Sequence, residues 1–143
     1  MDAALIGHIF HFCYLAQFID KTYNTLASKE GRIIGGISMG GYVAARFAVK
    51  YPQMFSAALM MSPAVWRNSQ GNACSSLHLF NNFDQATWEA EHPVAFLASY
   101  TVANSPVKFY AIHGTEDTVV PPADVEAFVE KLSQVVQAWM PPS

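Results

Sequence analysis

Five consecutive residues, Gly36 to Gly40, form the pattern Gly-x-Ser-x-Gly around Ser38. A short apolar run precedes them and a helix-forming stretch follows. A serine at a sharp strand-to-helix turn stands exposed above the sheet, where its hydroxyl can attack a carbonyl carbon. The flanking glycines leave room for strand and helix to pass closely, and the N–H groups that open the helix can stabilise an oxyanion. The segment predicts Ser38 as a nucleophile and the Met39 N–H as one of two oxyanion donors. The alternative is a glycine-rich turn that only binds an anion.

A second group of polar residues, His113-Gly114-Thr115-Glu116-Asp117, follows the last predicted strand. Active sites of open α/β sheets gather at the carboxyl ends of the strands. A buried carboxylate at that edge can orient an imidazole and stabilise its protonated form. We predict Asp117 as this acid, with Glu116 as the less favoured neighbour. Simple capping of the turn by Asp117 is the alternative.

Apolar runs and helical periodicity alternate along the chain and predict the elements that carry these residues. Residues 62–92 read as irregular, around Trp66 and Trp88. Strands separated by helical segments indicate a parallel sheet. The fold class is therefore α/β: one domain, 1–143, with a sheet of about three strands flanked by helices. We expect strands over 32–37, 55–61 and 107–113, and helices over 13–29, 40–51, 93–100 and 122–134.

Around both polar groups the chain resembles the α/β-hydrolase superfamily, specifically esterases of the esterase-D and mycolyltransferase-like type. The resemblance rests on Ser38-Met39-Gly40-Gly41-Tyr42, on Ser62-Pro63, and on H-G-x-x-D-x-x-V-P from His113 to Pro121, which looks like the family's acid loop. It implies a partial α/β-hydrolase fold. It also implies hydrolysis of short-chain or activated small-molecule esters through an acyl-enzyme on Ser38. Asp117 is then the triad acid and the Met39 N–H an oxyanion donor, with no metal and no organic cofactor.

The chain also departs from this family, in which the triad runs serine, acid, histidine. None of the 26 residues after Asp117 (143 − 117) is a histidine, and only 37 residues precede Ser38. We therefore expect the family's upstream strands, its second oxyanion donor and its final histidine-bearing strand and loop to be absent. His113 is the first alternative as base, ahead of the other histidines; a base from a second chain is another. Without a family histidine and a second oxyanion donor, we expect the site to have reduced catalytic competence.

The charge and the hydrophobic content of the chain limit the kinds of partner that it can bind. The net charge of −3, with 8 Lys and Arg residues, provides no basic surface for nucleic acid. Hydrophobic residues make up 52% of the chain, and the mean hydropathy of +0.17 is high for a domain of this size. This excess indicates apolar surface that an oligomer or a complementing chain would cover at an exposed strand edge. Two functions therefore compete with an esterase: a non-catalytic remnant that binds acyl ligands beside Ser38 and Trp66, and an interaction module completed by another chain.

The N-terminal apolar stretch, residues 3–18, reads as a buried helix. It is shorter than the roughly 20 residues that a membrane span requires, and it lacks the basic start of a signal peptide. His8, His11 and Cys13 do not share a face and predict no metal site. Two cysteines without a signal peptide favour the cytoplasm.

Overall fold

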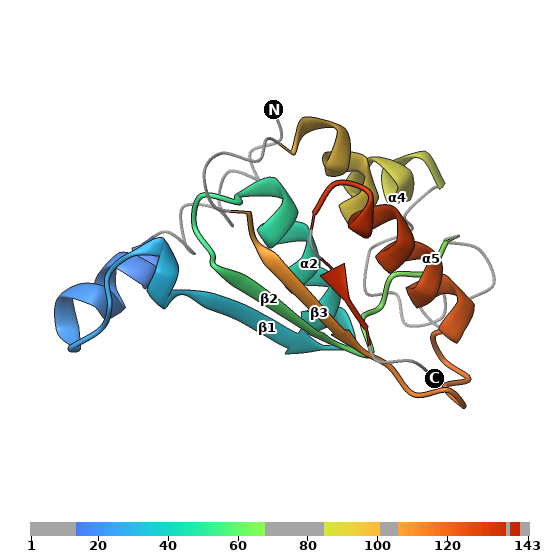
Figure 1. Cartoon of the computed structure of the whole chain (residues 1–143), viewed down its shortest axis with the longest axis horizontal. Helices are drawn as coiled ribbons and strands as arrows, with labels where there is room; N and C mark the ends of the chain where they lie inside the picture. Colours follow the sequence, from blue (N-terminus) through green and yellow to red (C-terminus); the bar gives the residue numbers. More distant parts are fainter. Residues whose placement is uncertain (1–13, 68–84, 101–105, 137, 141–143) are drawn as a thin grey trace.

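The structure is a computed structural model that describes residues 14–67, 85–100, 106–136 and 138–140. Within these ranges the chain forms one parallel sheet with helices over one of its faces (Figure 1). This confirms the α/β class. The histidines and the cysteine considered near the N-terminus lie outside the described residues, as do residues 68–84 of the segment predicted as irregular.

The sheet contains four strands in the order β1-β2-β3-β4. The first three lie within two residues of the predicted runs, and every neighbouring pair is parallel. The fourth strand was not predicted, because two residues before Met140 are too few to show a pattern. Its main-chain pairing with β3 defines it. The strands are β1 (Ile33–Ile37), β2 (Ala57–Met61), β3 (Lys108–Ile112) and β4 (Ala138–Trp139).

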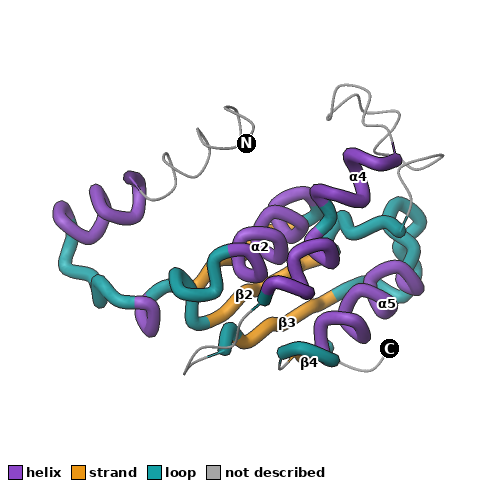
Figure 2. The backbone as a smooth tube through the Cα atoms, turned by 90° about the horizontal axis from the view of Figure 1, so that it is seen from above, coloured by secondary structure: helices purple, strands orange, loops and turns teal. Residues whose placement is uncertain are grey.

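Two 12-residue helices, α2 (Met39–Lys50) and α5 (Pro122–Ser133), match their predictions closely. The segment predicted as a helix over 93–100 is the 3₁₀ helix η2 (Pro93–Ser99). The end of the segment read as irregular contains α4 (Gln85–Glu91). In the views of Figures 1 and 2, α2, η2, α4 and α5 lie on the same side of the sheet.

The predicted helix over 13–29 is wrong beyond residue 22, where the chain leaves the helix and later forms the 3₁₀ turn η1 (Lys29–Gly31). Its apolar stripe is exposed, with Leu15 at 54% and Phe18 at 51%. Short helices are stable chiefly when an apolar face is packed. Here the helix over 14–22 extends away from the sheet at the amino end of β1 (Figure 1). The expectation of a buried N-terminal helix therefore fails for the described residues.

The core lies between α2, α5 and one face of the sheet. Small side chains on α2, among them Ala45 and Ala48, are fully buried and allow the helix to approach the strands. From the sheet, alternate residues of β2 and β3 point into this layer, as the two-residue period of a strand requires. They are Ala58, Met60, Phe109 and Ala111.

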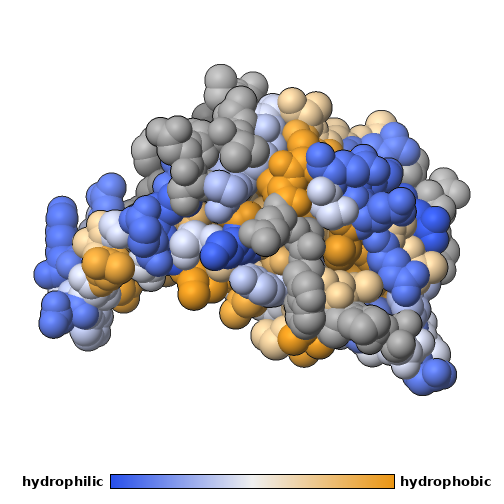
Figure 3. Space-filling model, viewed as in Figure 1, coloured by the Kyte–Doolittle hydropathy of each residue, from blue (hydrophilic) through white to orange (hydrophobic). Residues whose placement is uncertain are grey.

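The opposite face of the sheet is apolar and exposed. Ile37, Met61 and Ile112 are register neighbours on β1, β2 and β3, with exposed fractions of 67%, 45% and 57%. Leu59 and Tyr110 form the row behind them. Figure 3 shows apolar residues along the lower side of the molecule, beneath the strands of Figure 1. No described helix is long and apolar enough to cross a membrane.

Candidate active site

Ser38 occupies a strained turn between β1 and α2. Its backbone has φ 54° and ψ −117°, a conformation that is rare for a residue with a side chain. Ser38 is exposed, and no hydrogen bond joins its hydroxyl to a described residue. Strain of this kind persists only where surrounding contacts hold it, and it concentrates at functional sites. The geometry is that of a nucleophile elbow.

Three hydrogen bonds hold the Ser38 backbone. Its N–H donates to the Met61 carbonyl at 2.9 Å, which continues the β1–β2 ladder for one residue. Its carbonyl accepts from the Tyr42 N–H, which starts α2, and from the Ala64 N–H beyond β2, both at 3.0 Å. The turn is therefore tied to strand, helix and loop at once, and these contacts maintain the strain.

Two glycines are required by close backbone approach at this turn. A Cβ on Gly36 would lie 2.5 Å from the carbonyl carbon of Gly40, and one on Gly41 would lie 3.0 Å from Pro63 Cα. A Cβ on Gly40 would meet no atom within 4 Å. The expected role of the pattern's glycines is therefore correct for Gly36 and wrong for Gly40. Sequence reasoning missed Gly41, because its constraint comes from the loop after β2.

Met39 is the first residue of α2. The first N–H groups of a helix have no acceptor within it and carry the positive end of the helix dipole. The Met39 N–H is one of these groups, on the residue directly after Ser38. Its role as an oxyanion donor stays a prediction.

Asp117 lies in the loop that joins β3 to α5. Its Oδ1 accepts hydrogen bonds from the Val119 N–H at 2.8 Å and the Val120 N–H at 3.0 Å. These bonds, that from Val120 above all, and the neighbouring His113 ring hold the pKa of the Asp117 carboxyl below its usual value. The side chain is 21% exposed. Asp117 is therefore an ionised carboxylate at the edge of the sheet that carries Ser38, and it also caps its own loop.

The His113 ring forms a hydrogen bond across the same loop. Its Nε2 lies 2.9 Å from the Val120 carbonyl, to which the Nε2–H donates a hydrogen bond. Asp117 Oδ2 is 3.7 Å from this nitrogen, and Nδ1 is buried without a hydrogen-bond partner. No hydrogen bond joins either ring nitrogen to Ser38. An Nε2 that donates to a carbonyl cannot also accept the serine proton, so this arrangement favours a loop-closing role over that of the base.

The strand register shows why His113 and Ser38 do not meet. Ile37, Met61 and Ile112 are paired across three strands, so the next residues, Ser38, Ser62 and His113, form one row at the carboxyl edge. Adjacent strands lie about 4.8 Å apart, which puts the backbones of Ser38 and His113 about 10 Å apart. Ser62, between them, has φ 42°. Together with Ser38 it is one of two non-glycine residues with positive φ among those described, and sequence reasoning gave it no role.

Similarity to known proteins agrees with this geometry. The Esterase family ("Putative esterase") matches residues 8–138, which is most of the chain. The chain belongs to the Esterase family. Esterase Rv1288 of Mycobacterium tuberculosis (strain ATCC 25618 / H37Rv) is 31% identical over 106 residues, which cover 64% of this chain and 23% of that protein. The chain therefore spans about a quarter of this relative's length.

Two solved hydrolase structures share the fold of this chain. S-formylglutathione hydrolase (FrmB) of Staphylococcus aureus superposes with a TM-score of 0.64 at 20% identity, over 96% of this chain and 54% of the other. Staphylococcus aureus FphF, a fluorophosphonate-binding serine hydrolase, gives a TM-score of 0.70 at 18% identity, over 94% and 55%. The chain therefore has a partial α/β-hydrolase fold, which corresponds to about half the length of each of these two structures.

Among the residues that the structure describes, no three His, Cys, Asp or Glu side chains gather closely enough to hold a metal ion. Ser38 and Met39 follow β1, and Asp117 follows β3, so all three lie at the carboxyl edge of the sheet.

Proposed function

We propose that this chain carries a serine carboxylesterase site. Ser38 Oγ attacks the carbonyl carbon of an ester, and the hydroxyl proton leaves with the alcohol. Water then attacks the acyl carbon: its hydroxyl group goes to the acid, and its remaining proton returns to Ser38 Oγ. The observation that carries the proposal is the strained backbone of Ser38 between β1 and α2, held by three hydrogen bonds. Membership of the Esterase family supports it.

Electrostatic stabilisation in this proposal comes from the start of α2. The Met39 N–H donates to the oxygen that becomes negative when Ser38 attacks. The helix dipole adds to this effect, because the positive end of α2 faces the same oxygen. Removing one such donor in a complete site costs about 10²–10³ in kcat.

We propose that Asp117 is the acid of this site and that the site works with reduced competence. Asp117 is ionised, and its Oδ2 is not used by the loop amides that bond Oδ1. A triad acid holds an imidazole for the serine, and in the described residues the nearest imidazole, His113, is engaged with the Val120 carbonyl. Loss of a triad member costs up to about 10⁶ in kcat in subtilisin. Without a base from another source, turnover is confined to activated short-chain esters.

An interaction module is the second candidate, favoured by the exposed sheet face. Ile33 and Ile37 of β1 are 62% and 67% exposed, and in the described sheet β1 has no strand on its outer edge. Contiguous apolar surface of this kind marks interaction sites. A complementing chain would cover this face and could supply the base for Ser38.

The experiment is covalent labelling by a fluorophosphonate probe, read by intact mass and peptide mapping, alongside turnover of p-nitrophenyl acetate. Labelling at Ser38 that is lost in Ser38→Ala is the expected result. Ser62→Ala is the matched control, since Ser62 shares the positive φ and lies in the same row. Its labelling should equal that of the wild type.

Circular dichroism confirms that each protein is folded. A folded wild type that takes up no probe over hours would overturn the catalytic assignment. Labelling and turnover that appear only when a second polypeptide co-purifies would favour the interaction module.

A further inference from the structure

A cavity of about 450 Å³ lies on the helical side of the sheet, bordered by α4, η2 and α5. Its volume is in the range of small-molecule sites. Neither Ser38 nor Asp117 lines it, so it is separate from the candidate active site. Figures 1 and 2 show α4 and α5 on the same side of the sheet.

The wall of the cavity is aromatic and apolar. Trp88, Phe128 and Val65 contribute to it, and they are 2%, 3% and 1% exposed. The His92 ring packs edge-on against both aromatics, with centroids 5.7 Å from Trp88 and 6.0 Å from Phe128. Such a wall favours a ligand with a flat apolar body.

A buried donor belongs to the same cavity. His92 Nδ1 accepts a hydrogen bond from the Val94 N–H at 3.3 Å, which leaves the proton of the neutral ring on Nε2. This Nε2 is buried and makes no hydrogen bond of ordinary geometry to a described residue, although the Val65 carbonyl lies near the ring and raises its pKa. Burial lowers the pKa of His92 to about 4, so the ring is neutral at pH 7. An unsatisfied buried donor costs about 1–3 kcal/mol, which an acceptor on a ligand would recover.

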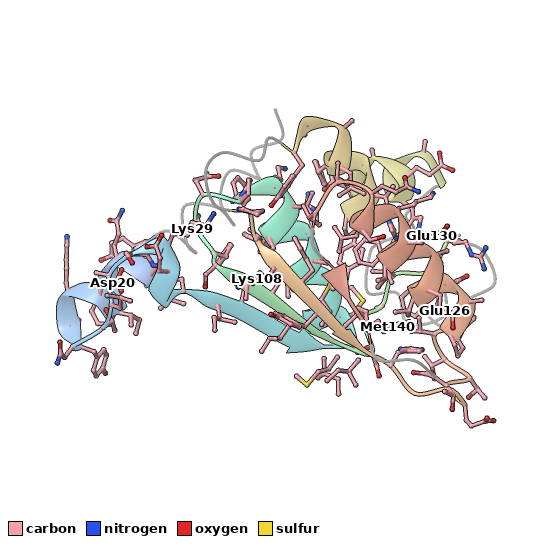
Figure 4. The ribbon with its side chains drawn as sticks, viewed as in Figure 1. Asp20, Lys29, Lys108, Glu126, Glu130 and Met140 are labelled. Carbon is pink, nitrogen blue, oxygen red and sulfur yellow. The ribbon has the colours of Figure 1, made fainter. Side chains whose placement is uncertain are left out.

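Four charged side chains line the cavity: Arg67, Lys131, Glu89 and Asp124. Their charges balance, so the place for an anion is beside Lys131 rather than the cavity as a whole. Asp124, Phe128 and Lys131 follow one another at helical spacing on the face of α5 that lines it. Asp124 is neutralised by Arg67, with Nε to Oδ1 at 2.6 Å and a second bond from the Arg67 N–H at 3.2 Å. Lys131 forms no ion pair with a described residue. The acidic side chains Glu126 and Glu130 of α5 are exposed and do not line the cavity (Figure 4).

We propose that this cavity binds an aromatic monocarboxylate. The carboxylate accepts a hydrogen bond from His92 Nε2 and pairs with the Lys131 ammonium, and the ring packs against Trp88 and Phe128. The binding is non-covalent and does not depend on Ser38.

The test is a titration of the ¹⁵N-labelled chain with phenylacetate, compared with phenylacetamide, its neutral isostere. Saturable shifts are expected at the Trp88 indole N–H and the Val94 amide, with affinity about tenfold higher for the carboxylate. Lys131→Met should remove most of this preference, and the matched control Lys108→Met, an exposed lysine on β3 that does not line the cavity, should retain it.

His92→Leu should also weaken phenylacetate binding, because it removes the buried donor. If His92→Leu fails to fold, the comparison of Lys131→Met with Lys108→Met still tests the proposal. Lys131 is exposed, so its replacement should not disturb the fold. Ser38→Ala should bind phenylacetate as the wild type does, which separates this result from the esterase test. Equal affinity for the two probes, equal loss in Lys131→Met and Lys108→Met, or shifts confined to the exposed sheet face would overturn the proposal.

Discussion

A Cβ added to Gly36 would lie 2.5 Å from the carbonyl carbon of Gly40, whereas one added to Gly40 would meet no atom within 4 Å. The two glycines of the Gly-x-Ser-x-Gly pattern are therefore not equivalent in this chain. Because Gly36 has no side chain, the end of β1 can lie directly against the backbone at the start of α2. Gly40 lies on the open side of the helix, where its lack of a side chain relieves no contact.

We predict opposite effects for Gly36→Ala and Gly40→Ala. Gly36→Ala forces the strand and the helix apart and should lower the free energy of unfolding by about 3 kcal/mol. Gly40→Ala adds a better helix former to α2 and should leave stability unchanged or raise it by about 0.5–1 kcal/mol. Urea unfolding followed by circular dichroism measures both. Equal losses in the two variants would contradict this account of the elbow.

The elbow was predictable from sequence because its signal is local. Five residues between an apolar run and a helix-forming stretch specify the turn, and the structure places Ser38 and Met39 there accordingly. The β1, β2, β3, α2 and α5 segments were predictable for the same reason.

Features that depend on distant parts of the chain were not predictable. The helix over 14–22 ends earlier than its apolar period indicates, and its Leu15 and Phe18 are 54% and 51% exposed, so the described residues leave its apolar stripe largely uncovered. The need for Gly41 comes from Pro63, in the loop after β2. The engagement of His113 by Val120 depends on how the acid loop folds back, which spacing alone does not show.

Asp117→Asn should destabilise the chain in a pH-dependent way. The native pKa of Asp117 is held below the unfolded value of 3.8, chiefly by the Val120 N–H. The stabilisation is therefore present above pH 3.8 and is lost as pH falls below it. At pH 7 the variant should lose about 1 kcal/mol, because an amide is a weaker acceptor for the loop N–H groups.

Urea unfolding at pH 7 and pH 2.5 measures this difference between Asp117→Asn and the wild type. The gap between the two proteins should narrow at the lower pH. A constant gap at both pH values would show that the Asp117 charge does not stabilise the loop.

His92 should make the chain acid-sensitive in a higher pH range. Burial lowers its pKa from 6.5 to about 4, against the opposing effect of the Val65 carbonyl; the nearby Lys131 lowers it further and Asp124 raises it. The unfolded chain therefore binds more protons between pH 6.5 and pH 4. The contribution of neutral His92 to the free energy of unfolding is complete above pH 6.5. This free energy should decrease by up to about 3 kcal/mol as pH falls to 4.

His92→Gln removes this titration but keeps an acceptor for the Val94 N–H. The free energy of unfolding of the variant should therefore change less than that of the wild type between pH 7 and pH 4. Chemical denaturation at half-unit pH intervals measures both curves. Parallel curves over this interval would rule out His92 as the source of the acid sensitivity.

The exposed sheet face should bind apolar dyes and promote self-association. Leu59, in the middle of this face, is 43% exposed and pairs in register with Tyr110. Leu59→Lys places a charge in the apolar patch and should reduce 8-anilinonaphthalene-1-sulfonate fluorescence and aggregation. Val43→Lys is the matched control, since Val43 is 42% exposed but lies on α2, over the other face of the sheet. Dye binding and light scattering at equal protein concentration compare the variants, and equal effects of the two lysines would show that the dye does not select the sheet face.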